Sequence, residues 1–568
     1  MKTQYVYDHY YKYDELTEFL QKLAQDYPEY CRLESFGQTD SGRQQWLMSV
    51  TKLSAGDFAD KPAFGVNGNI HAGEVTGTMC ACHFLDYLLT NRDDNEVDWL
   101  LTNFTVYCVP RITPDGAEYY LTTPYSVRSI PKMYPFEEVQ PGVQPEDVDG
   151  DGVIRKMRVR NPEGAFKISA DDPEVMIRRA PDETEGEFYD VFSEGLVEGY
   201  EGGELQPAPG KHGNDFNRNF PLNWLPENKQ AGAGSYALSN PETKALADYL
   251  FSKPNLCAVL NFHTSGGIYL YPPGFKHAKE ADPGDIARIK AIGKMATEET
   301  GYPALNLLDE YVGEAAGSMG IVGAFDDFCG YALGIVDFTC ECWDLVNRAG
   351  HPSVWPRPAN TPDEEEQAIF TDAVKWLKEN ENGEGYKPWT KFDHPQLGEV
   401  EIGGFDYKHT VQNPPSDFLQ QETEKHSRFL LRAMKTLPRL AWTDVKSVPV
   451  GEDTWKVDAT VINLGYLPTS AMKEAEVLKT AKPVRVTFTG AELISGKDCE
   501  DIGHLEGFSG VKGIYTAMGP STLGHKPYSK HMCWVVKGTA GTEVTLSASC
   551  PRAGRAETCV KLEKGTEV

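Results

Sequence analysis

Residues 63–77, AFGVNGNIHAGEVTG, join a short apolar run to a polar turn that opens a helical pattern. The same order of apolar run and polar end recurs in FTVYCVP at 104–110, CAVLNFH at 257–263 and LGIVDFTCEC at 333–342. Apolar strands that alternate with helices are typical of a mainly parallel sheet covered on both faces. The sequence therefore predicts an α/β domain.

Both ends of the chain add other elements. Residues 14–26 have helical apolar spacing, and residues 31–51 read as two strands joined by the turn QTDSGR, a predicted hairpin. From about residue 440, short alternating strands such as WKVDATVINLG and EVTLSASC predict a small antiparallel β-sandwich. We predict a catalytic domain at 1–437 and an accessory β-sandwich at 438–568.

A proline-rich, glycine-rich and acidic segment, about 125–210, interrupts the strand–helix alternation. From Asp182 to Glu204 it carries nine acidic residues and no basic one. It reads either as a lid on the catalytic domain or as a solvated acidic loop. Its DVDGDG at 147–152 matches the first half of a calcium loop, but Arg158 stands where the completing glutamate belongs. An acidic turn and a calcium site both remain open.

Composition excludes several classes of partner. The formal net charge of −29 argues against nucleic acid or an anionic membrane as the main partner. No run approaches the ~20 apolar residues of a membrane span, and the polar N-terminus has no secretory pattern. The twelve cysteines include no CxxC pair, which favours reduced thiols and a cytoplasmic location. Secretion after removal of a signal is the alternative.

Four polar side chains stand at the carboxyl ends of predicted strands. His71 and Glu74 follow the first quoted run, His263 ends another, and Glu341 lies in FTCECW. In an open parallel sheet these ends meet at the edge where ligands bind. Two imidazoles and a carboxylate suit Zn²⁺ and leave a fourth position for water. The other H-x-x-E copy, HAKE at 277–280, follows no strand, so we do not expect it to bind metal.

The motifs GQTDSGR, HAGE, PRITPDG, DFNRNF, SNPETKAL, FHTSGGIYLYP and FTCECW occur in this order between residues 5 and 345. In this order they resemble the zinc metallocarboxypeptidases of the M14 type. The resemblance implies a mixed, mostly parallel sheet of about eight strands flanked by helices, with one catalytic zinc per chain. The tail containing VINLGYLPTS resembles accessory sandwich domains of bacterial relatives.

Residue by residue, the resemblance places zinc on His71, Glu74 and His263, and makes Glu341 the general base that takes a proton from water. The chemistry agrees, because a metal lowers the pKa of water and a nearby carboxylate completes the deprotonation. On a strand, Glu341 points to one face and its two cysteine neighbours to the other.

Three further roles come from the resemblance. Asn217 and Arg218 match the pair that holds the free C-terminal carboxylate of a peptide, and an arginine fork suits that group. Arg155 lies where the family carries an arginine that stabilises the oxyanion. Arg158 and Arg160 are the alternatives if the alignment shifts.

The chain departs from the family at two places. The stretch GSMGIVGAFDDF at 317–328 contains no tyrosine where the family has a mobile one, so Tyr311 or Tyr331 replaces it or the role is absent. Gly73 stands where some members carry an arginine. Asp326 lies near the family's specificity pocket and, with the acidic segment, predicts substrates that end in Lys or Arg.

Three functions are compatible with these residues. The first is a zinc exopeptidase that removes residues from the C-terminus of peptides. The second is a zinc amidase that acts on branched or γ-linked, cell-wall-like peptides. The third is a non-catalytic peptide-binding protein, which has no need of the base Glu341. The sequence does not predict the oligomeric state.

Overall fold

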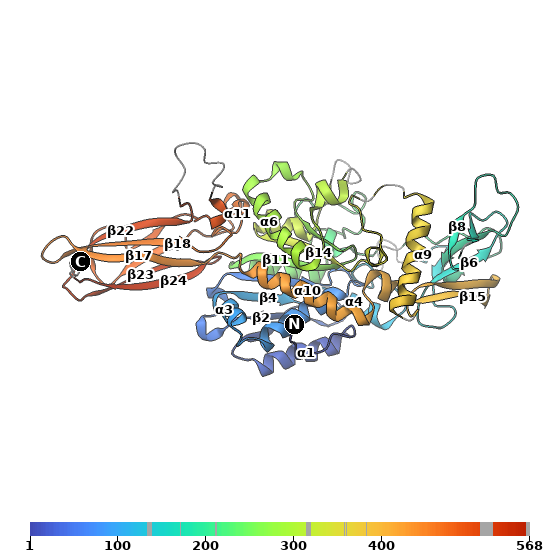
Figure 1. Ribbon diagram of the computed structural model, residues 1–568, viewed down its shortest axis with the longest axis horizontal. Coiled ribbons are helices and arrows are strands. Elements are labelled where there is room, and N and C mark those ends of the chain that lie inside the picture. The colour runs from blue at the N-terminus through green and yellow to red at the C-terminus, as the bar shows by residue number, and fades with distance from the viewer. Residues whose placement is uncertain are drawn as a thin grey trace.

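The computed structural model describes residues 1–132, 139–170, 172–210, 213–313, 320–356, 358, 361–381, 383–511 and 526–563. Figure 1 shows an elongated molecule with three parts in a row. The C-terminal strands lie at one end, a large sheet with helices lies in the centre, and a second sheet lies at the other end.

The central sheet is mixed and has eight strands. They are β1 (Cys31–Gln38), β2 (Gln44–Val50), β3 (Ala63–Gly68), β4 (Thr105–Val109), β11 (Leu256–Thr264), β12 (Ile268–Tyr271), β13 (Ala304–Asn306) and β14 (Val336–Cys342), in the spatial order β1-β2-β4-β3-β11-β14-β12-β13. The four central strands β4, β3, β11 and β14 are parallel to their neighbours within this group. The antiparallel pair β1–β2 is the predicted hairpin. The predicted fold class is confirmed.

Helices cover both faces of the central sheet. One face packs against α1 (Tyr13–Asp26), α2 (Thr76–Thr90), α6 (Pro283–Thr300) and α10 (Ser416–Met434), and the other against α5 (Pro241–Phe251) and α7 (Phe325–Phe328). Along β11, Leu260 and Phe262 join the first core and Val259 the second, as the two-residue period of a strand requires. Each such buried side chain contributes about 1.5–3 kcal/mol. The two cores fix the strand ends where the site lies.

The remaining α-helices are α3 (Asn95–Asn103), α4 (Pro114–Thr122), α8 (Leu345–Arg348), α9 (Asp363–Asn380) and α11 (Lys473–Leu478). Of these, α3 also packs Val97, Leu100 and Leu101 into the first core. Over the residues that the structure describes, no helix combines the length and the apolar composition needed to cross a membrane.

The second sheet combines two distant chain segments. Its order is β15 (Tyr386–His394), β16 (Gly398–Phe405), β6 (Lys156–Arg160), β9 (Tyr189–Ser193), β7 (Phe166–Ile168) and β8 (Met176–Arg178). β16 pairs antiparallel with β6, and β5 (Gly142–Pro145) pairs with β10 (Gly195–Glu198) beside it. Residues 125–210, predicted as a lid or a solvated loop, thus contribute strands β5 to β10 to these sheets, and their role stays a prediction.

The DVDGDG turn at 147–152 forms ion pairs with a lysine side chain of the same chain. The Asp147 carboxylate accepts hydrogen bonds from the backbone amides of both glycines of the turn. The ammonium of Lys387, on β15, lies 2.5 Å from Asp149 Oδ2 and 2.8 Å from Asp151 Oδ2. These contacts favour the acidic-turn alternative, since the lysine occupies two carboxylates that a calcium ion would need.

The C-terminal strands form two antiparallel sheets that share one core, as predicted. One contains β17 (Leu440–Pro449), β18 (Thr454–Asn463), β22 (Ser529–Lys537) and β20 (Glu492–Ser495), and the other β21 (Cys499–Asp501), β19 (Arg485–Thr489), β23 (Glu543–Cys550) and β24 (Gly554–Lys561). Trp455, Trp534 and Leu546 lie in the shared core. The buried Arg552 donates to the carbonyls of Leu333 and Gly334, just before β14.

Candidate metal centre

The turn after β3 positions His71 and Glu74. Asn69 adopts a left-handed backbone conformation with φ of 60°, which asparagine tolerates better than most residues. Its side-chain amide donates to the carbonyls of His71 (2.6 Å) and Ala72 (3.2 Å). The backbone amide of Glu74 donates to the His71 carbonyl at 3.2 Å. This closed turn directs both side chains over the ends of β3 and β11.

A glycine allows α2 to start close to the sheet. A Cβ atom on Gly77 would lie 2.8 Å from both the Cβ and the carbonyl oxygen of Phe262. That distance is shorter than van der Waals contact, so a larger residue would push α2 away from β11. The close approach keeps Glu74 near His263, the residue that follows Phe262.

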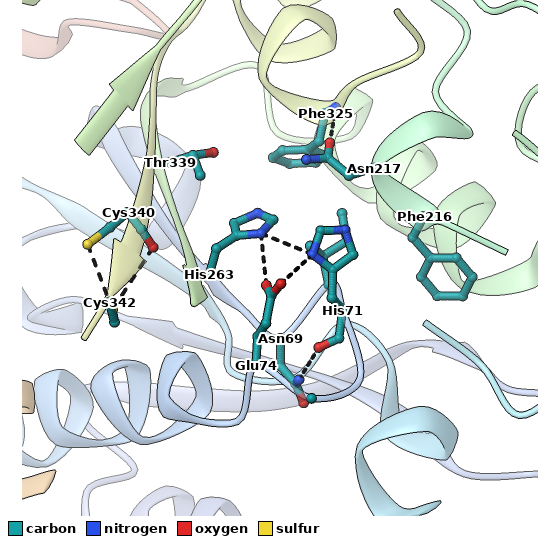
Figure 2. A network of polar contacts seen from close by, with 12 residues as sticks. Asn69, His71, Glu74, Phe216, Asn217, His263, Phe325, Thr339, Cys340 and Cys342 are labelled. Carbon is teal, nitrogen blue, oxygen red and sulfur yellow. Dashed lines mark hydrogen bonds and ion pairs between the residues drawn. The ribbon is translucent and has the colours of Figure 1, made fainter. Parts of the chain in front are cut away.

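Three donor atoms converge at these strand ends. Glu74 Oε1 lies 2.8 Å from His71 Nδ1, and Glu74 Oε2 lies 2.9 Å from His263 Nδ1. The two Nδ1 atoms are 3.2 Å apart, as Figure 2 shows. Two imidazole nitrogens on one tetrahedral zinc would be ~3.3 Å apart, given Zn–N distances near 2.0–2.1 Å. The three side chains therefore fit one zinc ion, and all three are buried.

The electrostatics of this cluster also suit a cation. Burial alone would raise the pKa of Glu74, but the two histidines hold it well below its usual value. Burial alone would lower the pKa of His263, but Glu74 raises it to about 9. The carboxylate therefore attracts positive charge into a buried site, and a metal ion would replace the imidazole protons there.

Asp215 fixes the orientation of His71. Its Oδ1 lies 3.1 Å from His71 Nε2 and accepts the backbone amide of Asn217 at 2.8 Å. A proton on Nε2 leaves the Nδ1 lone pair free to face Glu74 and His263. A carboxylate behind a ligating histidine is common in metal sites, because it fixes the tautomer and the ring orientation.

Glu341 lies beside His263. The two residues are paired in register on the parallel strands β11 and β14, which places their backbones about 4.8 Å apart. Burial raises the pKa of Glu341 to about 8, although His263 and Arg128 act in the opposite direction. The carboxyl group is thus close to the cluster and titrates near neutral pH.

The arginine that contacts the cluster is Arg128. Its Nη1 lies 3.4 Å from Glu74 Oε1 and its Nε lies 3.0 Å from Asp215 Oδ2. Arg155, predicted for this place, instead pairs with Asp151 at 2.6 Å. The alternatives are also engaged in the second sheet, Arg158 with Glu401 and Arg160 with Glu187. The placement of Arg155 at the cluster needs correction, because its segment folds into that sheet.

Asn217 and Arg218 lie in the short helix η3 (Phe216–Arg218), directly after Asp215. Asn217 Oδ1 accepts the backbone amide of Phe325 at 2.7 Å, a contact visible in Figure 2. Arg218 Nη1 donates to the Asn217 carbonyl at 2.6 Å. Both residues directly follow Asp215, which contacts His71. Their predicted contact with a peptide carboxylate stays a prediction.

Asp326 is enclosed. It is 3% exposed and accepts a hydrogen bond from the Thr339 hydroxyl on β14. Burial, followed by the charge of Asp326, raises the pKa of the neighbouring Asp337 well above its usual value. Asp326 therefore lies in a buried acidic pair, and its predicted contact with a basic substrate side chain stays a prediction.

The proposed replacements for the family's mobile tyrosine are packed against aromatic rings. Tyr311 lies 4.7 Å from Trp355 between ring centroids, and Tyr331 lies 5.4 Å from Phe275. Gly317, Ser318 and Met319 of the tyrosine-free stretch lie outside the described residues.

The second departure from the family, Gly73, has a steric reason. A Cβ atom there would lie 2.8 Å from the ring of Tyr120 and 2.7 Å from the side-chain amide of Gln412. The space that an arginine at this position would need is occupied.

A large cavity lies next to Arg128. Its volume is about 1310 Å³, and it runs between the central part and the second sheet. Ser126 and Val127 line it together with aromatic side chains that include Tyr125, Phe192 and Phe370. Among the described residues, its lining includes Arg155 and none of the three candidate metal ligands.

Two buried imidazoles and a carboxylate at the carboxyl edge of an α/β sheet are the ligand set of a catalytic zinc site. A family model described as zinc carboxypeptidase matches residues 16–348, more than half of the chain. The chain belongs to the zinc carboxypeptidase family, and the resemblance seen in the motifs is confirmed. A second model, described as a domain of unknown function, matches residues 439–561.

Individual relatives match over short segments. Carboxypeptidase B of Astacus astacus is 35% identical over 113 residues, which are 20% of this chain and 35% of that protein. Carboxypeptidase D of Homo sapiens is 30% identical over 111 residues, 19% of this chain and 8% of that protein. The chain thus spans about a third or less of these relatives. A crystal structure of thrombin activatable fibrinolysis inhibitor aligns with a TM-score of 0.43 and 14% identity, covering 75% of this chain and 74% of that one.

Two contacts of the cluster, Asp215 and Arg128, were not predicted. Asp215 stands in the DFNRNF motif, and its position two residues before Asn217 is the signal that could have found it. Arg128 lies in the loop TTPYSVRSIP, where a lone arginine carries no motif.

Proposed function

We propose that this protein is a zinc-dependent exopeptidase that hydrolyses the C-terminal peptide bond of peptides. The observation that carries the proposal is the convergence of His71, Glu74 and His263, with Glu341 one strand away. These three residues would hold the zinc. When bound, the ion supplies a Lewis acid that polarises a carbonyl group and lowers the pKa of water.

Glu341 acts as the general base and then as the general acid. It takes a proton from the attacking water, whose oxygen bonds to the carbonyl carbon, and later gives that proton to the leaving amine as the C–N bond breaks. Burial raises the pKa of this carboxyl group above its usual value, which favours release of the proton to the leaving amine.

Arg128 stabilises the oxyanion in this proposal, in place of Arg155. Its guanidinium is held by Glu74 and Asp215 before substrate arrives. A preorganised donor needs no rearrangement when charge develops on the carbonyl oxygen, which is why such groups lower the barrier.

Asn217 and Arg218 bind the free carboxylate at the end of the peptide. Arg218 can form two parallel hydrogen bonds to a carboxylate, and the Nδ2 of Asn217 remains a donor because only its Oδ1 is used by Phe325. Asp326 would select a terminal Lys or Arg, provided that its bond with Thr339 opens toward the substrate.

The proposal is tested with matched peptides and mass spectrometry. One peptide carries a free C-terminal carboxylate, a second has the same sequence with a C-terminal amide, and a third has a γ-linked branch. We expect stepwise loss of C-terminal residues from the first only, loss of activity with a chelator, and recovery with Zn²⁺. Faster cleavage of the γ-linked peptide would favour the amidase, and binding without cleavage would favour a peptide-binding protein. A set of free-carboxylate peptides that differ only in the last residue tests Asp326. If peptides that end in Phe or Glu are cleaved as well as, or better than, those that end in Lys or Arg, Asp326 does not select the substrate.

A further inference from the structure

A second group of donor atoms lies behind the strand that carries Glu341. Cys80 on α2, Cys342 on β14 and His426 on α10 place one ligand atom each within 4.8 Å of one another. All three side chains are fully buried. Because neighbouring residues on a strand point to opposite faces, Cys342 faces these helices while Glu341 faces the metal centre.

Cys340 lies beside this group, and its sulfur approaches two of the three members. Its Sγ lies 3.7 Å from Cys342 Sγ and 3.8 Å from His426 Nδ1. Two thiolates bound to one tetrahedral zinc would have sulfur atoms ~3.8 Å apart, given a Zn–S distance near 2.3 Å. Figure 2 shows Cys340 and Cys342 on β14, away from the histidine cluster. The observed separation is that of ligands on one ion, and is too long for a disulfide.

The surroundings of His426 favour metal binding through Nδ1. Its Nε2 lies 3.2 Å from Glu422 Oε1, and Glu422 also holds the Lys425 ammonium at 2.7 Å and the Tyr302 hydroxyl at 2.6 Å. The carboxylate can therefore accept a hydrogen bond from Nε2–H, which leaves the Nδ1 lone pair facing the thiols. This is the carboxylate–histidine arrangement that supports metal ligands.

One contact competes with the metal. The Tyr269 hydroxyl lies 2.7 Å from His426 Nδ1 and can donate to the same lone pair. A core histidine satisfied by tyrosine would need neither the thiols nor the carboxylate, whereas this histidine has both. Tyr269 therefore provides a variant that separates the two roles.

From this geometry we infer that Cys80, Cys342 and His426 hold a second, structural zinc ion, with the adjacent Cys340 as the fourth ligand. Thiolate and imidazole ligands select Zn²⁺ over magnesium or calcium. Four protein ligands leave no open position, which is the mark of a structural rather than a catalytic site. Binding releases the thiol protons to solvent. The ion would tie α2 and α10 to β14 directly behind Glu341.

The test is metal analysis of the purified full chain, together with cobalt substitution. Wild type is expected to contain two zinc ions per chain, and Cys80→Ser and His71→Ala one each. In the cobalt form, thiolate-to-metal charge-transfer absorption is expected in wild type and in His71→Ala, and not in Cys80→Ser. The His71 site contains no sulfur, so this absorption reports on the second site alone and does not depend on the proposed peptidase function.

Two outcomes would overturn the inference. One is a single zinc per chain in wild type without thiolate absorption in the cobalt form. The other is a His71→Ala variant that contains no metal. If Cys80→Ser does not fold, Tyr269→Phe replaces it. This variant removes the competing hydroxyl and should keep two zinc ions and the absorption, whereas one zinc and no absorption would contradict the site.

Discussion

His263 and Glu341 face each other in register on the neighbouring parallel strands β11 and β14. The strand pairing, and not a loop, therefore sets the distance between a candidate zinc ligand and the candidate base. Hydrogen bonds along both strands hold this relationship, so it does not depend on substrate. A rigid scaffold of this kind is what a site with precise geometry requires.

Replacement of Glu341 by Gln should abolish turnover without loss of zinc. Glutamine has the same shape but cannot accept the proton from water, so kcat should fall by about 10²–10⁴-fold. Steady-state kinetics and metal content of the same preparation check this. Unchanged activity would refute the assigned role, and loss of zinc would make Glu341 a ligand instead.

Arg128→Ala and Arg155→Ala form a matched pair. Loss of an oxyanion donor costs about 10²–10³-fold in kcat, so Arg128→Ala should show this decrease. Arg155→Ala removes an ion pair with Asp151 in the loop before β6 and should leave kcat close to wild type. If instead Arg155→Ala lowers kcat and Arg128→Ala does not, Arg155 stabilises the oxyanion, as the family resemblance implies. The assignment of this role to Arg128 would then be wrong.

Arg218→Ala should weaken binding of substrates through their terminal carboxylate. A hydrogen bond to a charged group contributes about 1.5–3 kcal/mol, so KM for a free-carboxylate peptide should rise by roughly 10–100-fold. Lys244→Ala, which removes an exposed ion pair with Asp248 on α5, is the control and should leave KM unchanged. An equal KM for wild type and Arg218→Ala would remove the arginine from substrate recognition.

Glu242→Gln should stabilise the protein in a pH-dependent way. Burial raises the pKa of Glu242 from 4.5 to about 7, and its Oε2 has no hydrogen-bond partner among the residues that the structure describes. The folded state therefore holds a proton that the unfolded state has lost between these values, and stability falls as pH rises from 4.5 to 7. Above pH 7, glutamine should recover about 3 kcal/mol.

Thermal unfolding of wild type and Glu242→Gln at several pH values measures this difference. The midpoints should coincide near pH 4.5 and separate above neutrality. Asp248→Asn, an exposed change on the same helix, should show no such trend. A constant difference at all pH values would mean that the carboxylate is not the cause.

Much of the candidate metal centre was predictable because its residues stand at strand ends. The apolar runs before His71 and His263 identify buried parallel strands, and parallel strands bring their carboxyl ends to one edge. Neither step needs tertiary information. The hairpin, the first helix and the antiparallel C-terminal sheets were predictable for the same reason, since each rests on local periodicity.

The contacts of Arg128 and the second sheet depend on pairing between distant segments. Strand β6 contains an alternating pattern, but nothing local to it indicates that its partner is β16. Arg155 lies away from the cluster because it directly precedes β6, which pairs with β16. The predicted domain boundary at 437/438 lies between α10 and β17. Arg552 donates hydrogen bonds to carbonyl groups on both sides of this boundary, so the boundary stays a prediction.

The pairing of β16 with β6 also limits how the protein can be shortened. Deletion of residues 139–198 alone would strip one edge of β16 and leave its backbone groups open to solvent. An exposed edge of this kind pairs readily with another chain, so such a truncation should aggregate. A well-behaved minimal version must remove residues 386–405 in the same step.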